Sequence, residues 1–273
     1  MSSFRAACVQ LRSSDDVEEN VRIASDLICE AKSKGAQFIA TPENTTLMAA
    51  DGGAKLENSY AEEDDPALPR FRVLAEELGV WLLIGSLAVK TSDRKTANRS
   101  FLIDPKGTIA ARYDKVFLFD VDLPSGETYR ESNTVTGGNR AAVADLPWGR
   151  VGLSICYDLR FPQLYRRLAQ AGSSFLAVPS AFTETTGKAH WDVLLRARAI
   201  ESGAFVIAPA QGGMHANGRQ TYGHSMLVGP WGEVLAEAGT EPCVISADID
   251  TDAVGIARQR VPSLRHDRKF DGP

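Results

Sequence analysis

Short apolar runs recur along the whole chain, and polar, glycine or proline residues separate them. Runs of this length between turn residues favour β-strands. Turn sequences such as Asp104-Pro105-Lys106-Gly107 join neighbouring runs and predict hairpins. We predict strands at residues 4–11, 37–40, 80–89, 98–103, 108–113, 141–146, 151–155, 175–178, 204–208, 224–228, 233–236 and 244–249.

Between these runs, apolar residues recur at helical spacing. The first such stripe has Ser13 or Ser14 as its predicted N-cap and ends at Gly35; its apolar members are Val17, Val21, Ala24, Ile28 and Ala31. A second helix is predicted from Asp65-Pro66, as cap and first residue, to about Leu78. Further helices are predicted at 164–171 and 191–201.

The alternation of strands and helices, with hairpins between them, predicts an α/β protein with mixed sheets and helices outside. We find no low-complexity linker, internal repeat or break in composition within residues 1–273. A single domain is therefore expected. Residues 258–273 are charged and helix-poor, and we predict a C-terminal tail that wraps a neighbour or frays.

Charge and hydropathy exclude several classes of protein. The formal net charge is −5 with both signs interspersed, whereas a dedicated nucleic-acid-binding protein would carry a basic face. No apolar run reaches membrane-spanning length, and the amino terminus lacks a signal-peptide pattern. We expect a cytoplasmic protein without a nucleic-acid or membrane partner.

The cysteines and histidines indicate neither a disulfide framework nor a metal site. The four cysteines are scattered without a Cys-x-x-Cys pair, and the four histidines lack metal-ligand spacing. Walker and dinucleotide-binding sequences are also missing. No metal or cofactor is expected.

One cysteine stands out by its position. A strand-like run stops at Cys156, and polar residues follow before a predicted helix. A thiol at the rim of a sheet can meet a substrate, and it needs a base because it is mostly protonated at neutral pH. Glu43 and Lys115 also follow strand-like runs. Glu43 would serve as the base if burial raised its pKa, while Lys115 and the Tyr157 amide would stabilise an oxyanion.

Other interpretations of these residues remain open on position alone. Free cysteines are among the most buried residue types, which is the expected role of Cys8, Cys29 and Cys243. Taken singly, Glu43 and Lys115 are better explained as a surface salt bridge or as two unrelated exposed residues, because charged residues are mostly exposed. A Cys-His arrangement using one of the four histidines is a further alternative.

Three segments, in chain order, resemble the signature regions of the nitrilase superfamily of carbon-nitrogen hydrolases: Thr41-Pro42-Glu43, Asp114-Lys115-Val116-Phe117-Leu118 and Ser154-Ile155-Cys156-Tyr157-Asp158-Leu159-Arg160-Phe161-Pro162. The resemblance covers almost the whole chain. It implies a four-layer α-β-β-α sandwich, assembled as a homodimer or higher homo-oligomer.

The same resemblance implies catalytic roles. Glu43 would be the general base, Lys115 would stabilise the tetrahedral intermediate, and Cys156 would form a thioester. A second glutamate is expected near them, and Glu131 matches it better than Glu127. Phe117 stands where the family often has histidine, which puts the positioning around Lys115 in doubt.

Within the family, the chain resembles the deaminated glutathione amidases most. The resemblance lies in residues 115–124, in 181–183 with 190–191, and in 210–213 through 222–225. That branch implies hydrolysis of a terminal carboxamide to a carboxylate and ammonia. A substrate with carboxylates calls for a cation, for which Arg160 is the first candidate and Arg130 a weaker one. Arg160 would equally form a salt bridge with Asp158. Phe182 and Thr183, just past a strand, are expected to line the pocket.

Three other functions stay open. The nearest is an ω-amidase acting on α-ketoglutaramate or another small-acid amidase. A nitrilase is not excluded by the motifs. The third is a non-catalytic binding protein with the same fold, against which the intact set of Glu43, Lys115 and Cys156 argues.

Overall fold

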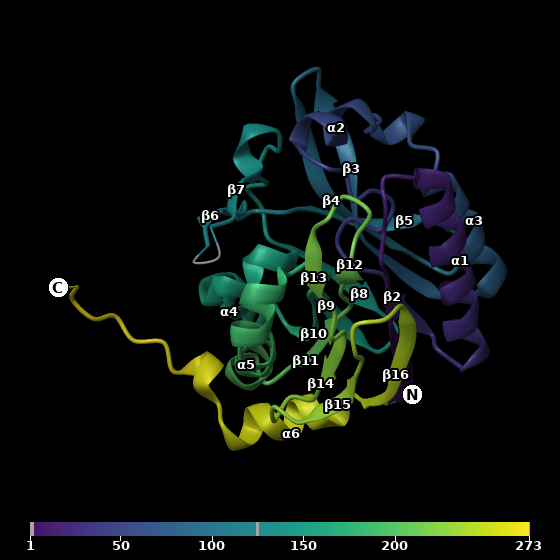
Figure 1. The fold of residues 1–273 in the computed structure, drawn as a ribbon. Coiled ribbons are helices and arrows are strands. Elements are labelled where there is room, and N and C mark those ends of the chain that lie inside the picture. The colour runs from purple at the N-terminus through teal and green to yellow at the C-terminus, as the bar shows by residue number, and fades with distance from the viewer. Residues whose placement is uncertain (1–2, 124–125, 273) are drawn as a thin grey trace.

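The computed structural model describes residues 3–123 and 126–272. Two large mixed sheets lie in the middle of the molecule, and helices cover their outer faces (Figure 1). This is the α-β-β-α sandwich that the motifs predicted. Pro124, at the end of the 115–124 segment, and Pro273, at the end of the predicted tail, lie outside the described residues.

The first sheet carries two helices on its outer face. Its strands lie in the order β16-β1-β2-β3-β4-β5. Strand β1 pairs parallel with β2 and antiparallel with β16, so the sheet is mixed. The elements are β16 (Cys243–Asp250), β1 (Ser3–Gln10), β2 (Phe38–Ala40), β3 (Trp81–Ser92), β4 (Lys95–Ile103), β5 (Ile109–Asp114), α1 (Val17–Ser33) and α3 (Leu68–Leu78).

The second sheet is built in the same way, in the order β15-β14-β11-β10-β9-β8. Helices α4 and α5 pack on it. The elements are β15 (Val234–Glu237), β14 (Met226–Val228), β11 (Phe205–Ala208), β10 (Ser173–Ala177), β9 (Gly149–Leu153), β8 (Ala142–Leu146), α4 (Pro162–Gln170) and α5 (Glu184–Ser202).

Smaller elements surround the ends of the sheets. They include two short hairpins, four short helices and two elements near the C-terminus: β6 (Asp120–Asp122) with β7 (Thr128–Arg130), β12 (Gly212–Met214) with β13 (Gln220–Tyr222), α2 (Gly52–Glu57), η1 (Glu62–Asp64), η2 (Glu131–Asn133), η3 (Cys156–Arg160), α6 (Asp252–Arg260) and η4 (Ser263–Arg265).

Strand β1 explains why two apolar layers form. Phe4, Ala6 and Cys8 point into the cluster between the sheets, whereas Ala7 and Val9 pack under α1 and α3. Successive side chains of a strand point to opposite faces. A strand that is apolar on both faces must therefore be covered on both, which a four-layer sandwich provides.

The helix boundaries differ from the sequence-based expectation at two places. Asp16, rather than Ser13 or Ser14, caps α1 by accepting a hydrogen bond from the Glu19 amide. The Ser14 hydroxyl instead accepts from the Asp16 amide, and the Ser13 hydroxyl donates to the Thr45 carbonyl. Asp65 accepts bonds from the first amides of α3 as predicted, although the helix itself begins at Leu68.

Helix α5 begins seven residues before the predicted 191–201 segment, at Glu184. Thr183 caps it by accepting a hydrogen bond from the Thr186 amide. Its first turns are polar and contain Gly187, so their helical pattern is weak. A Cβ at Gly187 would lie 2.2 Å from Tyr222, which shows that the glycine is there for close packing.

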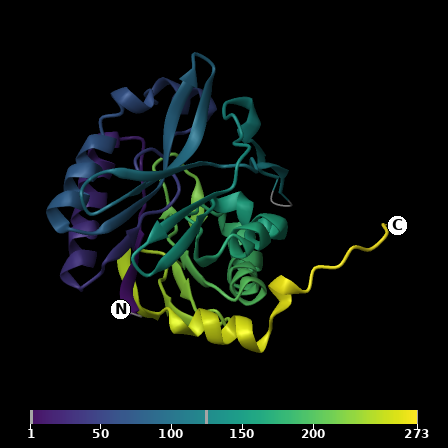
Figure 2. The same ribbon diagram turned by 180° about the vertical axis from the view of Figure 1, so that it is seen from behind.

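The prediction of a helix-poor tail at 258–273 is wrong in part, because α6 extends to Arg260 and η4 follows. Arg258 donates to the Ser202 carbonyl at 3.1 Å and so ties α6 to the end of α5. Val254 and Ala257 give α6 a buried apolar side. Only beyond η4 does the chain lead away from the body of the molecule (Figures 1 and 2).

Candidate active site

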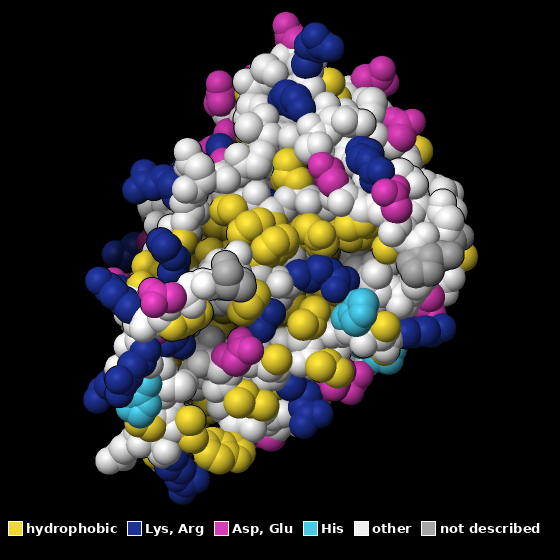
Figure 3. All heavy atoms as spheres, turned by 90° about the vertical axis from the view of Figure 1, so that its left-hand side faces the viewer, with side chains coloured by type: hydrophobic (Ala, Val, Ile, Leu, Met, Phe, Trp, Pro, Cys, Tyr) yellow, Lys and Arg dark blue, Asp and Glu magenta, His cyan; other side chains and the backbone are white. Residues whose placement is uncertain are grey.

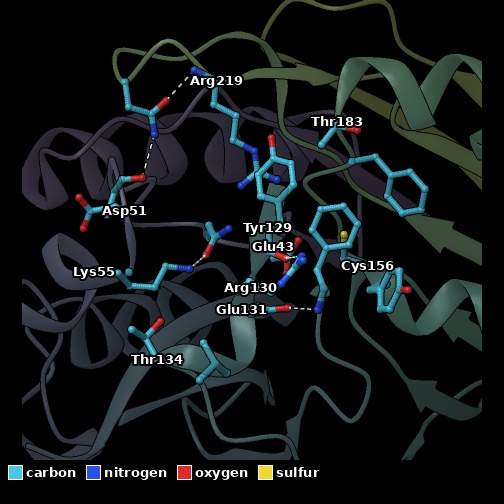
Figure 4. A pocket seen from close by; sticks show the side chains of 18 of the residues that line it. Glu43, Asp51, Lys55, Tyr129, Arg130, Glu131, Thr134, Cys156, Thr183 and Arg219 are labelled. Atoms are coloured by element: carbon cyan, nitrogen blue, oxygen red, sulfur yellow. Dashed lines mark hydrogen bonds between the residues drawn. The ribbon is translucent and has the colours of Figure 1, made fainter. Parts of the chain in front are cut away.

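Three strand ends bring the predicted catalytic side chains together. Glu43 follows β2, Lys115 follows β5 and Cys156 follows β9, so the cluster draws on both sheets. The Lys115 Nζ lies 2.9 Å from Glu43 Oε1 and 2.9 Å from Glu131 Oε2. Glu43, Lys115 and Cys156 are each at most 7% exposed. Figure 4 shows Cys156 and Glu43 side by side in the cavity.

Both oxygens of Glu43 are fixed by donors. Its Oε2 accepts from the Ala181 amide at 3.0 Å, and its Oε1 accepts from Asn98 at 2.8 Å as well as from Lys115. Burial alone would raise the pKa of this carboxyl, but the charge and hydrogen bond of Lys115 outweigh it and lower the pKa to about 2. The sequence-based expectation of a raised pKa is therefore wrong.

The loop that carries Glu43 passes over a glycine. A Cβ at Gly85 would lie 2.1 Å from the Thr41 carbonyl oxygen and 2.4 Å from that of Pro42. Real Cβ atoms do not approach backbone so closely, so only glycine lets β3 lie this near to the loop. From the other side, Gln211 Nε2 donates to the Glu43 carbonyl at 3.0 Å.

Glu131, rather than Glu127, is the second glutamate beside Lys115. Its Oε2 also accepts from the Phe119 amide at 2.7 Å. Asn98 Nδ2 bridges the two carboxylates, at 2.8 Å from Glu43 Oε1 and 3.2 Å from Glu131 Oε1. Sequence analysis did not single out Asn98, since it lies inside a strand and belongs to none of the three motifs.

Cys156 occupies a backbone conformation that is uncommon for a non-glycine residue, with φ of 50°. It opens η3, and its amide donates to the Pro179 carbonyl at 2.9 Å. Burial, followed by the negative charge of Glu43, raises the pKa of the thiol despite the opposing charge of Lys115. At neutral pH the sulfur is therefore protonated while Glu43 is ionised, and Lys115 does not by itself produce a thiolate.

A second carboxylate lies beneath the Cys156 turn. Asp158 is fully buried and accepts from the Ile155 amide at 2.8 Å, the Phe117 amide at 2.9 Å and the Tyr113 hydroxyl at 2.7 Å. Burial raises the pKa of Asp158 to about 6. Because Tyr113 and Phe117 flank Lys115, Asp158 links the lysine loop to the cysteine turn.

Phe117 also helps to fix the lysine loop. Its ring stacks on Phe161 with centroids 3.6 Å apart and an angle of 5° between the planes. The aromatic residue thus packs against the segment that follows Cys156. The position where the family often has histidine is thus filled by a ring that stacks on Phe161.

The cluster lies in a cavity of about 520 Å³. All the predicted site residues line this cavity. They are the three catalytic candidates Cys156, Glu43 and Lys115, the supporting residues Tyr157 and Glu131, and the predicted substrate contacts Arg160, Arg130, Phe182 and Thr183. The volume lies within the usual range for small-molecule sites. The face that carries α4 and α5 is hollowed, with hydrophobic and basic side chains along the hollow (Figure 3).

The predicted substrate-binding side chains differ in how many contacts they already make with other residues of the protein. Arg160 lies 3.2 Å from His190 Nδ1, and its guanidinium is over the Phe182 ring at 5.3 Å. Among the described residues it has no salt bridge to Asp158, whose oxygens are taken by other donors. Arg130 instead forms a two-bond ion pair with Asp122, at 2.8 and 2.9 Å. Thr183 Oγ1 is occupied in capping α5.

Two further cations of the cavity were missed by sequence analysis. Lys55 is on α2, and Arg219 is on the turn between β12 and β13. Neither has a local pattern that distinguishes it from a solvated charge. Their position at the cavity depends on how α2 and the hairpin fold over the ends of the sheets.

The described part of the chain holds no cluster of three His, Cys, Asp or Glu side chains arranged for a metal ion. None of its histidines lines the cavity. His215 is buried against Ser13 and Thr221, and His190 contacts Arg160. The Cys-His alternative therefore has no geometric support.

Within residues 3–123 and 126–272, every helix is too short or too polar to cross a bilayer.

Known proteins resemble this chain along nearly its whole length. Deaminated glutathione amidase of Synechocystis is 42% identical over 97% of this chain and 98% of its own length. Omega-amidase of Homo sapiens is 38% identical over 98% of this chain and 96% of its own.

Two solved structures share the fold. The C. elegans NitFhit protein superposes with a TM-score of 0.92 at 36% identity; the match covers 98% of this chain and 66% of that longer one. An amidase from Nesterenkonia sp. AN1, with an acetamide moiety attached to its active-site cysteine, gives a TM-score of 0.82 at 26% identity, covering 97% of this chain and 94% of that one. The carbon-nitrogen hydrolase family model matches residues 5–259. The chain therefore belongs to the carbon-nitrogen hydrolase family, as its three motifs predicted.

Proposed function

We propose that this protein is a cysteine-dependent amidase that acts on deaminated glutathione, with Glu43, Lys115 and Cys156 as its catalytic residues. The observation that carries the proposal is the convergence of a protonated thiol, an ionised carboxylate and an ammonium group in one cavity. The Synechocystis relative supports the choice of substrate. So does the cavity, which is large enough for a tripeptide analogue and lined by several cations.

In the first half of the proposed cycle, the thiol proton moves to Glu43 as sulfur attacks the amide carbonyl. The carbonyl oxygen becomes an oxyanion, which Lys115 and the Tyr157 amide stabilise. When Lys115 bonds the oxyanion, its hold on Glu43 weakens and the pKa of that carboxyl rises. Glu43 then protonates the departing amine, the carbon-nitrogen bond breaks, and a thioester to Cys156 remains.

In the second half, Glu43 removes a proton from water, and the resulting hydroxide attacks the thioester carbonyl. The carbon-sulfur bond breaks, the product leaves as a carboxylic acid, and the sulfur recovers its proton from Glu43. Glu131 supports the cycle by holding Lys115 from the other side. The ammonium thus stays aimed at the reacting oxygen throughout.

The leaving group differs between the two main candidate substrates. The amides of deaminated glutathione are internal, so cleavage at its keto-acid side releases cysteinylglycine and an α-keto dicarboxylate. A terminal carboxamide, and therefore ammonia, is present in α-ketoglutaramate instead. The ammonia expected from the sequence thus belongs to the ω-amidase alternative, which the human relative favours.

The test is a panel of substrates incubated with the purified protein. Cysteinylglycine from deaminated glutathione and ammonia from α-ketoglutaramate, N-carbamoyl acids and nitriles are measured separately. We expect the highest kcat/KM for deaminated glutathione, a trapped acyl adduct on Cys156 by mass spectrometry, and no turnover by Cys156→Ala. Cys29→Ala, which alters an exposed cysteine, is the matched control. Turnover by Cys156→Ala, or no turnover of any substrate by the wild type, would overturn the proposal.

We also propose that the chain is a single domain which acts in the cytoplasm as a homodimer or higher homo-oligomer, without a nucleic-acid or membrane partner. The resemblance to the family supports the assembly, and the net charge of −5 supports the absence of nucleic acid. Analytical ultracentrifugation at several concentrations tests the assembly, and a single monomeric species would overturn it.

A further inference from the structure

The charges that line the cavity are unevenly compensated. Lys115 is held between Glu43 and Glu131, and Arg130 is paired with Asp122. Within the described residues, Lys55 and Arg219 have no carboxylate partner. Asp51, the remaining carboxylate of the lining, accepts from the Ala54 amide at the start of α2.

Lys55 and Arg219 are both anchored beside Glu43. The Lys55 ammonium donates to the Asn44 side chain at 3.0 Å, and Asn44 directly follows Glu43. Arg219 Nη2 donates to the Ala181 carbonyl at 2.9 Å, while the amide of the same Ala181 donates to Glu43. Figure 4 shows the two cations on the side of the cavity away from Cys156.

The elements that carry the two cations are fixed to one another. Asn217, in the turn that holds Arg219, donates to the Met48 carbonyl at 3.2 Å and to the Ala49 carbonyl at 2.8 Å. Those carbonyls immediately precede α2, which holds Lys55. Hydrogen bonds from the Asn217 side chain therefore hold the turn against the segment that leads into α2.

Both groups retain hydrogen-bonding capacity. The Lys55 ammonium has three donors, and Arg219 Nε is buried without a partner among the described residues. Burial, together with the positive charges of Lys115 and Arg219, lowers the pKa of Lys55 against the attraction of Glu131 and Glu43. An anion bound between the two cations would relieve this repulsion.

The mechanism determines which end of the substrate meets these cations. Glu43 returns its proton to the departing amine, so the leaving group must lie on the Glu43 side of the reacting carbon. Arg160 is in η3, four residues after Cys156, with its guanidinium over the Phe182 ring, and in the proposed function it binds the acyl part. We propose that Lys55 and Arg219 form a second carboxylate-binding subsite, which grips the C-terminal carboxylate of the peptide leaving group and so selects a peptide amide over a simple carboxamide.

This inference rests on the proposed function, and its test separates the two. Three substrates are compared: deaminated glutathione, the same molecule with its C-terminal carboxylate converted to a carboxamide, and α-ketoglutaramate. In the wild type, amidation of the carboxylate should lower kcat/KM by about tenfold or more, the scale of one charge-assisted hydrogen bond. This comparison needs no mutation and is unaffected by folding defects.

In Lys55→Met and Arg219→Gln, the penalty for amidation should shrink to less than about threefold, because the group that recognised the carboxylate is lost. Thermal unfolding confirms that each variant is folded. Lys188→Gln, which removes a charge from the exposed face of α5, should keep the full wild-type penalty.

Three outcomes would count against the subsite. An equal penalty in wild type and variants would place the carboxylate elsewhere, and no penalty in the wild type would show that the carboxylate is not recognised. In both cases turnover of deaminated glutathione leaves the proposed function intact. A wild type that hydrolyses α-ketoglutaramate but not deaminated glutathione would overturn the proposed substrate and the subsite together.

Discussion

Two buried carboxylates near Cys156 respond to burial in opposite ways. Glu43 faces the cavity beside the Lys115 ammonium, and its pKa is lowered to about 2. Asp158 lies under the Cys156 turn among neutral donors, and its pKa is raised to about 6. Both lose nearly all contact with water. The difference therefore comes from the neighbours rather than from the depth of burial.

The comparison teaches what each region is built to do. A full positive charge next to Glu43 keeps this carboxylate ionised, and in the proposed mechanism the substrate's oxyanion draws that charge away. Three neutral donors around Asp158 fix its geometry but offset only part of the cost of burying a charge. One carboxylate is suited to proton transfer, and the other joins the lysine loop to the cysteine turn.

The largest effect is expected from Lys115→Met, which removes the ammonium group that lies 2.9 Å from Glu43. The pKa of Glu43 should rise because burial is no longer opposed, and the oxyanion loses its ammonium donor. We expect kcat/KM to fall by about a thousandfold. Steady-state kinetics across a pH series measure this, with Lys188→Met as a control on the exposed face of α5. A loss below tenfold would contradict the role of Lys115.

The next largest effect is expected from Gly85→Ala. This substitution should displace Glu43, but it removes none of the charged residues around it. The added methyl group would meet the Thr41 carbonyl at 2.1 Å, so the loop must shift. A misplaced base should lower kcat by about a hundredfold. Gly255→Ala, where a Cβ would have no neighbour within 4 Å, is the matched substitution. Equal activity of the two variants would show that the loop tolerates the shift.

A smaller effect is expected from Asn98→Ser, which removes the bridge between the two glutamates but keeps Lys115. Glu43 loses one of its three donors, so its orientation becomes less fixed. We expect kcat to fall by about tenfold with little change in KM, because Asn98 acts through Glu43. An unchanged kcat, or a loss confined to KM, would argue that Lys115 and Ala181 suffice to hold the base.

The smallest effect on turnover is expected from Asp158→Asn, whose main readout is the pH dependence of stability. A carboxyl whose pKa rises from 3.8 unfolded to about 6 folded destabilises the protein as pH increases through that window. The wild type should therefore lose up to about 3 kcal/mol of unfolding free energy between pH 4 and 6. The asparagine variant should lack this loss. Urea unfolding at each pH tests it, and parallel curves would refute it.

Much of the fold was readable from the sequence, since the strands that bury both faces are continuous apolar runs. The polar first turns of α5 were missed because their helical conformation depends on the Thr183 cap and on packing of Gly187 against Tyr222. The end of α6 was also missed. Arg258 there donates to the Ser202 carbonyl, and this contact joins residues that are far apart in the sequence.

The family motifs placed Glu43, Lys115 and Cys156, each at the end of a strand. The motifs do not include Asn98, Lys55 or Arg219. The positions of these residues at the cavity depend on a strand pairing, a short helix and a hairpin turn, respectively. The direction of the Glu43 pKa was also beyond the sequence. It depends on whether the ammonium of Lys115 lies 2.9 Å away or points elsewhere, which only the fold decides.

The left-handed backbone conformation at Cys156 lowers the stability of the protein. A side chain at φ of 50° is tolerated there only because the surrounding contacts impose it. Glycine adopts that conformation without penalty. Cys156→Gly should therefore be inactive, yet its free energy of unfolding should exceed that of Cys156→Ala by about 1 kcal/mol. A cysteine at this position thus lowers the stability of the fold, as expected of a residue whose proposed role is chemical.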